Sequence, residues 1–309
     1  MLTLMRMKLS NANRYPMILS GMVSVLLLFV IFALPAMSVK QVAIVVGCND
    51  YENVPLIASV INAENVSKVL KEAGYEVWTM TDKALDAKGD YHPEKLFPTK
   101  TNLERQVSIW APEKSYGKGD LILFYFSGHG VRIEGIDYLV PLRFGEGKPD
   151  HLVSLPYIYE QLRRSGAQNI IVMTDACRYV PGEKGLSKRD RDVEFGKSGN
   201  ALGTVSTEAQ CYAFLRNCPE GCKFPEEDDG KMSYISQAIV EGLRGKADDT
   251  GAGVITIRNL YKYVLNWFKS HFKNRSRIPT LQYGGEGSGT DAIVLRDFRK
   301  DQSPQPAPK

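Results

Sequence analysis

The sequence predicts an α/β fold in which a mainly parallel sheet is flanked by helices. Short apolar runs rich in branched residues recur along the chain, and they are typical of strands buried on both faces of a parallel sheet. Segments with apolar residues at helical spacing separate these runs. In two places, residues 121–126 and 170–173, polar chemistry begins abruptly where the run ends. The crevice of an open α/β sheet lies at the carboxyl ends of its strands, so a site is expected there.

The first part of the sheet is expected to be a β-α-β unit. Residues 41–46 form its first strand, residues 57–73 carry apolar side chains at helical spacing up to Gly74, and residues 75–80 form its second strand. Residues 82–98 are polar and contain glycine and proline, which predicts a surface insertion.

A helix and the third strand follow this insertion. Thr101 and Glu104 have the spacing of a capping box, and residues 121–126 form the strand. The helix would bury three apolar side chains, those of Leu103, Val107 and Trp110.

A hairpin over residues 131–141, turning at Glu134 and Gly135, is expected after the third strand. A helix then begins at Ser154 and ends at Gly166. The later elements are strands at 170–173, 211–216 and 292–295, the last closing the sheet, and helices at 233–243 and 257–268.

Two segments lack periodicity. Residues 178–207 are rich in glycine and charge and predict a flexible loop, and residues 299–309 predict a disordered tail rich in proline. With a separate N-terminal segment over residues 1–38, one domain is expected over residues 39–298.

The N-terminal segment has the features of an export signal. Three basic residues, Arg6, Lys8 and Arg14, precede an apolar run over residues 17–37, and small residues stand near Ser38 where signal peptidase would cut. The run is also long enough to remain as a membrane anchor. Either way the domain is expected outside the cytoplasm, periplasmic or extracellular, or held at the membrane by residues 17–37.

Composition is that of a globular protein, with 43% hydrophobic and 24% charged residues among 309. The net charge of +4 is dispersed and no basic helix is interleaved with aromatic residues, so nucleic acid is not an expected partner. Of the five cysteines, Cys218 and Cys222 can pair, whereas Cys48 and Cys211 are expected to be small buried hydrophobes. Cysteine and histidine spacing indicates no zinc site.

Cys177 and His129 are the candidates for chemistry, because each follows a buried strand. The thiolate is the nucleophilic form of cysteine, and an imidazole can act as its base. The amide groups of Gly130 and Cys177 are the natural oxyanion donors. Asp175 would place a negative charge near the same opening, where it can bind a basic substrate residue. The other histidines, His92, His151 and His271, lack a strand-end context and are expected to be structural or on the surface.

These residues resemble the caspase and metacaspase superfamily of cysteine endopeptidases. The similarity extends from Gln41 to Asp297. It rests on the first strand and helix, on Ser127-Gly128-His129-Gly130, on Tyr138-Leu139-Val140-Pro141 and on Asp175-Ala176-Cys177, while residues 233–245 look like the small-subunit helix of bacterial members. The resemblance implies a caspase-like three-layer sandwich with a mainly parallel six-stranded sheet flanked by helices, and an intersubunit-type loop over residues 178–207. It also implies that His129 is the general base, that Cys177 is the nucleophile, and that Gly130 binds the oxyanion together with Cys177.

The resemblance also implies a substrate pocket. Metacaspases carry an aspartate two residues before the nucleophile and cut after Arg or Lys, and Asp175 matches them. Asn62 stands where a second pocket aspartate is usual, which removes one charge. Arg143 occupies a position that is often acidic in metacaspase calcium sites. We therefore expect no metal or other cofactor, with calcium as a disfavoured alternative.

The sequence thus predicts an exported cysteine endopeptidase that acts on protein or peptide substrates through a thioacyl intermediate, with a preference for Arg or Lys. Its contact with the membrane is expected only through the N-terminal segment. Self-cleavage at Lys184, Lys188, Arg189 or Arg191 is a further hypothesis. The alternative is a catalytically silent caspase-like binding or scaffold domain of the cell envelope. Cleavage after Asp is disfavoured because Asp175 would repel an acidic side chain.

Overall fold

A computed structural model describes residues 39–51, 55–84, 97–117, 119–142, 149–176, 211–216, 231–272, 279–284 and 293–301. The described residues lie within one compact unit, Val39–Lys309.

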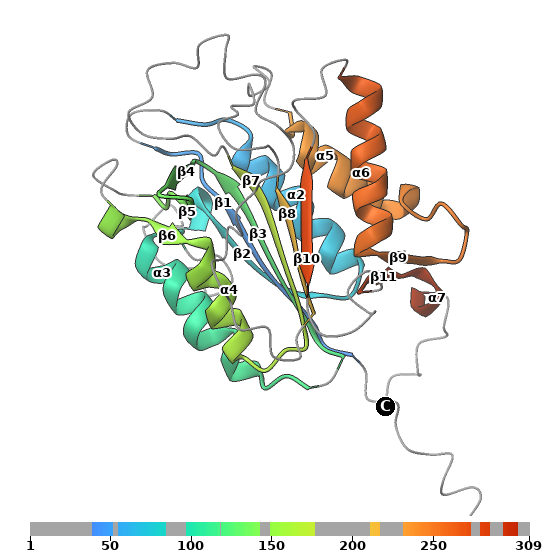
Figure 1. Ribbon diagram of the computed structural model, residues 1–309, viewed down its shortest axis with the longest axis horizontal. Coiled ribbons are helices and arrows are strands. Elements are labelled where there is room, and N and C mark those ends of the chain that lie inside the picture. Colours follow the sequence, from blue (N-terminus) through green and yellow to red (C-terminus); the bar gives the residue numbers. More distant parts are fainter. Residues whose placement is uncertain are drawn as a thin grey trace, which may run out of the picture. The chain divides into compact units, whose positions relative to one another are not determined.

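A mainly parallel sheet of six strands forms the centre of the described structure (Figure 1), as the sequence predicts. Its order is β10-β8-β7-β3-β1-β2, and the edge strand β10 is the one that runs antiparallel to its neighbour. The strands are β1 (Gln41–Gly47), β2 (Glu76–Thr81), β3 (Leu121–Gly128), β7 (Asn169–Ala176), β8 (Cys211–Arg216) and β10 (Thr280–Gly284).

Helices cover both faces of this sheet, which makes a three-layer sandwich (Figure 1). Alternate side chains of β1 show the two faces, because Val45 belongs to one hydrophobic core and Ile44 to the other. The first core includes α2 (Ser59–Glu72), α5 (Tyr234–Glu241) and α6 (Ile257–His271), and the second includes α3 (Lys100–Arg105) and α4 (Leu155–Arg164).

Two smaller sheets accompany the central one. The predicted hairpin is confirmed as β4 (Gly130–Ile133) and β5 (Ile136–Leu139), and its turn residues Glu134 and Gly135 both have positive φ. A third strand, β6 (Val153–Ser154), pairs with β5. The other sheet pairs β9 (Val254–Thr256) with β11 (Val294–Asp297), after which the chain forms the short helix α7 (Phe298–Asp301).

The assignment of the closing strand is wrong in the sequence prediction. Residues 292–295 were expected to close the central sheet, but the strand there is β11, which pairs with β9 in the separate sheet. The edge of the central sheet is instead β10, which pairs with β8. A short apolar strand fits either sheet, and its sequence does not specify its partner.

The predicted cap of α3 is also wrong. Thr99, not Thr101, is the N-cap, and its hydroxyl accepts the backbone N–H of Asn102 at 3.2 Å. The Asn102 side chain donates to the carbonyl of buried Phe97 at 2.8 Å. This hydrogen bond fixes the chain two residues before Thr99. Trp110 is half-buried, whereas Leu103 and Val107 are fully buried as expected.

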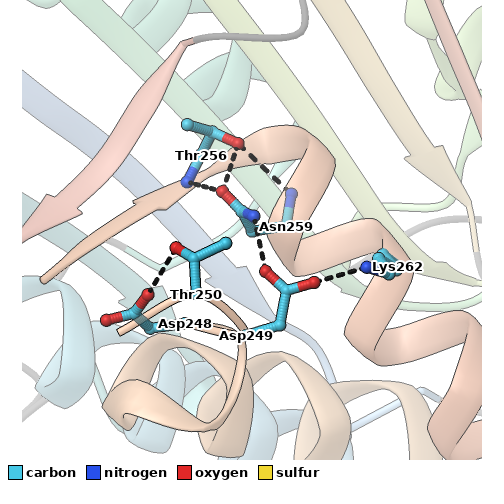
Figure 2. Close-up of polar contacts among 6 residues, drawn as sticks. All are labelled: Asp248, Asp249, Thr250, Thr256, Asn259 and Lys262. Atoms are coloured by element: carbon cyan, nitrogen blue, oxygen red, sulfur yellow. Dashed lines mark hydrogen bonds and ion pairs between the residues drawn. The ribbon is translucent and has the colours of Figure 1, made fainter. Parts of the chain in front are cut away.

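At the start of α6, local polar contacts hold the helix and the turn before it together (Figure 2). Thr256 and Asn259 form a reciprocal capping box in which each side chain accepts the other residue's backbone N–H. Asp249 accepts the Asn259 amide at 3.2 Å and binds the Lys262 ammonium. Asp248 accepts two backbone N–H groups of the following loop, so the turn before β9 is tied to itself and to the helix.

Within the residues described, no helix combines the length and the apolar character needed to cross a membrane. The N-terminal run over residues 17–37 lies outside the described residues, as do the loop over residues 178–207, residues 302–309 of the expected tail, and Cys218 and Cys222.

Candidate active site

Strands β3 and β7 bring together the residues that directly precede the two predicted catalytic positions. They are parallel neighbours in which Gly128 pairs with Ala176 at the carboxyl end. His129 directly follows Gly128 and Cys177 directly follows Ala176. Neighbouring strands lie about 4.8 Å apart. Cys177 itself lies outside the described residues. The pairing of Gly128 with Ala176 is therefore the evidence that relates the two predicted catalytic positions.

His129 is partly exposed, and its backbone is held on both sides. Its N–H donates to the hydroxyl of Tyr51 at 2.9 Å, and its carbonyl accepts the N–H of Val140 at 3.0 Å. The Tyr51 ring lies against the imidazole with a centroid distance of 4.4 Å. The following Gly130 is buried at the start of β4. The segment that carries His129 therefore has a defined conformation.

Asp175 is the penultimate residue of β7, and its side chain is 8% exposed. One carboxylate oxygen accepts the Asn62 amide at 3.1 Å, the Ser236 hydroxyl at 2.7 Å and the hydroxyl of Ser233. All three partners donate and are neutral, which matches the needs of an ionised carboxylate. The structure thus brings the two predicted pocket residues, Asp175 and Asn62, into direct contact.

Asn62 connects this carboxylate to three elements. Its amide also donates to the Ser127 hydroxyl of β3 at 3.1 Å, and its carbonyl oxygen accepts the N–H of Ser233, the N-cap of α5, at 2.9 Å. Gly47 permits this arrangement, since a Cβ there would lie 2.5 Å from the carbonyl oxygen of Ser59 in the first turn of α2. The close approach of α2 to β1 thus places Asn62 over the sheet edge.

Tyr125 completes the network from beneath. Its hydroxyl lies 2.6 Å from that of Ser236, and because Ser236 donates to Asp175, Tyr125 is the donor in this pair. Burial, and then the charge of Asp175, raise the pKa of Tyr125 well above its ordinary range. The phenol therefore stays protonated and remains a donor.

A buried ionic cluster lies beside this edge. Asp137 of β5 binds Arg132 of β4 at 2.9 Å and lies 3.6 Å from Arg216 at the end of β8. The three side chains are almost fully buried, and Arg216 also donates to Gln282 of β10. Desolvation by burial lowers the pKa of Arg216, and the Asp137 charge opposes this effect. The cluster joins the hairpin after His129 to the central sheet.

Cys48 is a buried residue without exposed surface, as predicted. Burial, and then the charge of Asp82, raise the pKa of its thiol well above the ordinary value. A thiol of this kind is a poor nucleophile. The burial of Cys211 and the position of His92 lie outside what the structure describes, whereas His151 is half-buried and His271 exposed.

Several residues of the site escape prediction from the sequence. Ser233, Ser236 and Tyr51 contact a predicted site residue directly, and Tyr125 contacts Ser236. A signal existed for Ser233 alone, because a serine before the apolar periodicity of α5 is typical of an N-cap. The others were hidden inside a strand, a helix and a loop, where nothing in the local pattern marks a tertiary contact.

The grouping of potential metal ligands in space is a further feature of the described residues. Nowhere in that part of the chain do three histidine, cysteine or acidic side chains come together as potential metal ligands. The acidic run over residues 226–229 and Arg143 lie outside the described residues.

Comparisons with known proteins agree with this geometry. Residues 40–286 match the caspase domain family, Peptidase_C14. The uncharacterized protein y4kE of Sinorhizobium fredii is 24% identical over 151 residues, which are 48% of this chain and 42% of that protein. The chain thus matches less than half the length of this relative.

Two solved structures are similar in fold. Protein GSU0716 of Geobacter sulfurreducens has a TM-score of 0.54 at 14% identity, with 84% of this chain and 98% of that chain covered. Caspase-1 of Spodoptera frugiperda has a TM-score of 0.52 at 13% identity, with 79% of this chain and 86% of that chain covered. At such identities the similarity concerns the fold alone.

Proposed function

Because the chain belongs to the caspase domain family, we propose that it is a cysteine endopeptidase with His129 and Cys177 as its catalytic dyad. The observation that carries this proposal is the pairing of Gly128 with Ala176, since it aligns the residues directly before the histidine and the cysteine. The export signal expected at the N-terminus supports action outside the cytoplasm.

The proposed reaction is acyl transfer to the cysteine followed by hydrolysis. His129 accepts the thiol proton as the Cys177 sulfur attacks the scissile carbonyl, and the imidazolium then protonates the leaving amine. Water attacks the resulting thioacyl group, which releases the acid and regenerates the thiol. The amides of Gly130 and Cys177 are the proposed donors to the oxyanion in both steps.

The proposed specificity is for Arg or Lys before the scissile bond. The support is the Asp175 carboxylate two residues before Cys177, held in place by Asn62, Ser233 and Ser236. A carboxylate fixed in this way is suited to bind a cationic side chain. Asn62 in place of a second acid makes the attraction weaker than two carboxylates would provide.

The test is the cleavage of fluorogenic peptides with Arg, Lys, Asp or a neutral residue before the scissile bond. The full-length chain is compared with Cys177→Ala and His129→Ala, and with His151→Gln as the control. We expect cleavage after Arg and Lys, a loss of about three orders of magnitude or more in both dyad variants, and no loss in the control.

The pocket is tested separately with Asp175→Asn. This change is expected to lower kcat/KM for Arg and Lys peptides by about 30-fold or more, which corresponds to losing one partner of a buried charge pair.

Turnover that survives in Cys177→Ala would contradict the dyad. An absence of turnover in the parent protein, with and without calcium, would favour the silent scaffold.

A further inference from the structure

Tyr51, which comes from a different strand end, contacts both the backbone and the ring of His129. Tyr51 follows β1 by four residues and is 9% exposed. Its hydroxyl accepts the His129 N–H at 2.9 Å and donates to the Val140 carbonyl at 2.8 Å. The Val140 N–H in turn donates to the His129 carbonyl at 3.0 Å. These three hydrogen bonds form a closed ring around the backbone of His129.

The same tyrosine also restrains the imidazole. The two rings have centroids 4.4 Å apart and planes inclined by 50°, so the Tyr51 ring occupies one side of the space in which His129 can rotate. Backbone and side chain of His129 are therefore both in contact with one residue.

The absence of a side chain at Gly128 makes room for the contact between Tyr51 and His129. A Cβ at position 128 would lie 2.5 Å from the Tyr51 hydroxyl oxygen and 2.9 Å from the Phe126 ring. The glycine before His129 thus leaves the space through which the hydroxyl reaches the backbone.

The Tyr51 hydroxyl keeps its proton across the physiological range. Burial is the largest cause that raises its pKa, and the neighbouring Cys48 adds to this effect. The hydroxyl therefore remains a donor to Val140 near neutral pH.

We propose that Tyr51 is the positioning residue of His129, fixing the backbone and the imidazole orientation that proton transfer with Cys177 requires. This inference rests on the proposed function for its effect on turnover. It assigns Tyr51 no contact with substrate.

The test compares Tyr51→Phe with Tyr75→Phe in the full-length chain. Tyr75 is a matched control because it is also buried, its hydroxyl also donates to a backbone carbonyl, that of Leu295 at 3.0 Å, and it directly precedes the amino end of β2. Thermal unfolding is measured for both variants to show that each is folded. Phenylalanine keeps the ring and removes the two hydrogen bonds of the hydroxyl.

We expect Tyr51→Phe to lower kcat by about 10- to 100-fold, the range that a small misplacement of a catalytic group produces, with KM unchanged within a factor of about two. Tyr75→Phe leaves both constants unchanged. In a protein labelled with ¹³C-histidine, one of the four histidine ring signals, assigned by its loss in His129→Gln, shifts in Tyr51→Phe and not in Tyr75→Phe.

Equal kinetics in the two phenylalanine variants would overturn the proposal, and so would a Tyr51→Phe effect confined to KM. An unchanged His129 signal in Tyr51→Phe would overturn it as well. If the parent protein cleaves no peptide, the proposed function fails, and the ring signal of His129 then decides alone whether Tyr51 orients it.

Discussion

At the scale of single residues, the side chain of Asp82 positions the backbone of a loop that leads to the site. One of its carboxylate oxygens accepts the backbone N–H groups of Asn49 and Asp50 at 2.8 and 2.9 Å. Those residues directly precede Tyr51, so Asp82 fixes the loop that brings the tyrosine to His129. Asp82 was expected to begin a polar surface insertion, and the sequence gives no sign that its carboxylate faces inward.

The raised pKa of Asp82 predicts that the stability of the protein depends on pH. Desolvation by burial, as the largest cause, raises its pKa from the usual value. The folded protein therefore binds this proton more tightly than the unfolded chain does, and the free energy of unfolding falls as pH rises from the unfolded to the folded pKa. Asp82→Asn keeps an acceptor oxygen but cannot ionise, so this decline is expected to be smaller in the variant.

The measurement is urea denaturation of both proteins in steps from pH 3.5 to pH 7. Asp249→Asn is the control, because hydrogen bonding to Lys262 lowers the Asp249 pKa and reverses the sign. A parent and an Asp82→Asn variant with parallel profiles would show that the carboxylate of Asp82 does not titrate as described.

The residue scale also shows what the sequence can and cannot predict about the site. His129, Asp175 and Cys177 were predicted as site residues because abrupt ends of apolar strands mark the edge where chemistry is placed. Asn62 was predicted through the family resemblance. Tyr51 could not be predicted, because a tyrosine in a loop carries no mark of a hydrogen-bond partner 78 residues away.

At the scale of elements, the helices, the parallel strands and the β4–β5 hairpin were predictable, whereas the edge strand β10, the partner of β11 and the cap of α3 were not. Strands β1, β3 and β7 are continuous apolar runs buried on both faces, a pattern that the sequence states directly. Strand β10 has mixed composition and takes its place at the sheet edge through pairing with β8. The spacing of Thr101 and Glu104 predicted the wrong cap for α3, because Thr99, two residues earlier, accepts the backbone N–H of Asn102.

Element stability yields a prediction at the capping box of α6 (Figure 2). Thr256→Ala removes the acceptor of the Asn259 N–H and is expected to lower the free energy of unfolding by about 1 kcal/mol. Thr250→Ala is the control, since its hydroxyl makes an exposed 3.4 Å contact with Asp248. Chemical denaturation of both variants checks this. Equal losses would mean that the cap contributes no more than the exposed contact.

At the scale of the whole molecule, the hairpin sheet is joined to the central sheet by charge as well as by Tyr51. Asp137 lies between Arg132 of the hairpin and Arg216 of β8, and all three are buried. Removing the central charge of such a group is costly, because two desolvated guanidinium groups each lose an opposite charge.

Asp137→Asn is therefore expected to lower the free energy of unfolding by about 3–5 kcal/mol. Asp297→Asn is the matched control. The nitrogen–oxygen distance is 2.8 Å in the Arg299–Asp297 pair and 2.9 Å in the Arg132–Asp137 pair, but the Arg299 side chain is 67% exposed. Its loss is expected to cost less than about 1 kcal/mol. Denaturant titrations at one pH compare the two, and a similar small loss in both would contradict the role assigned to the buried cluster.

The partners of Asp175 also set an order of events during synthesis. Ser233 and Ser236 follow Asp175 by 58 and 61 residues. At about 5–20 residues per second, a ribosome adds them roughly 3–12 seconds after Asp175. A growing chain therefore contains His129 and Cys177 before it contains the two hydroxyl groups that hold the neighbouring carboxylate. The environment proposed to select the substrate is completed only after the residues proposed to cut it.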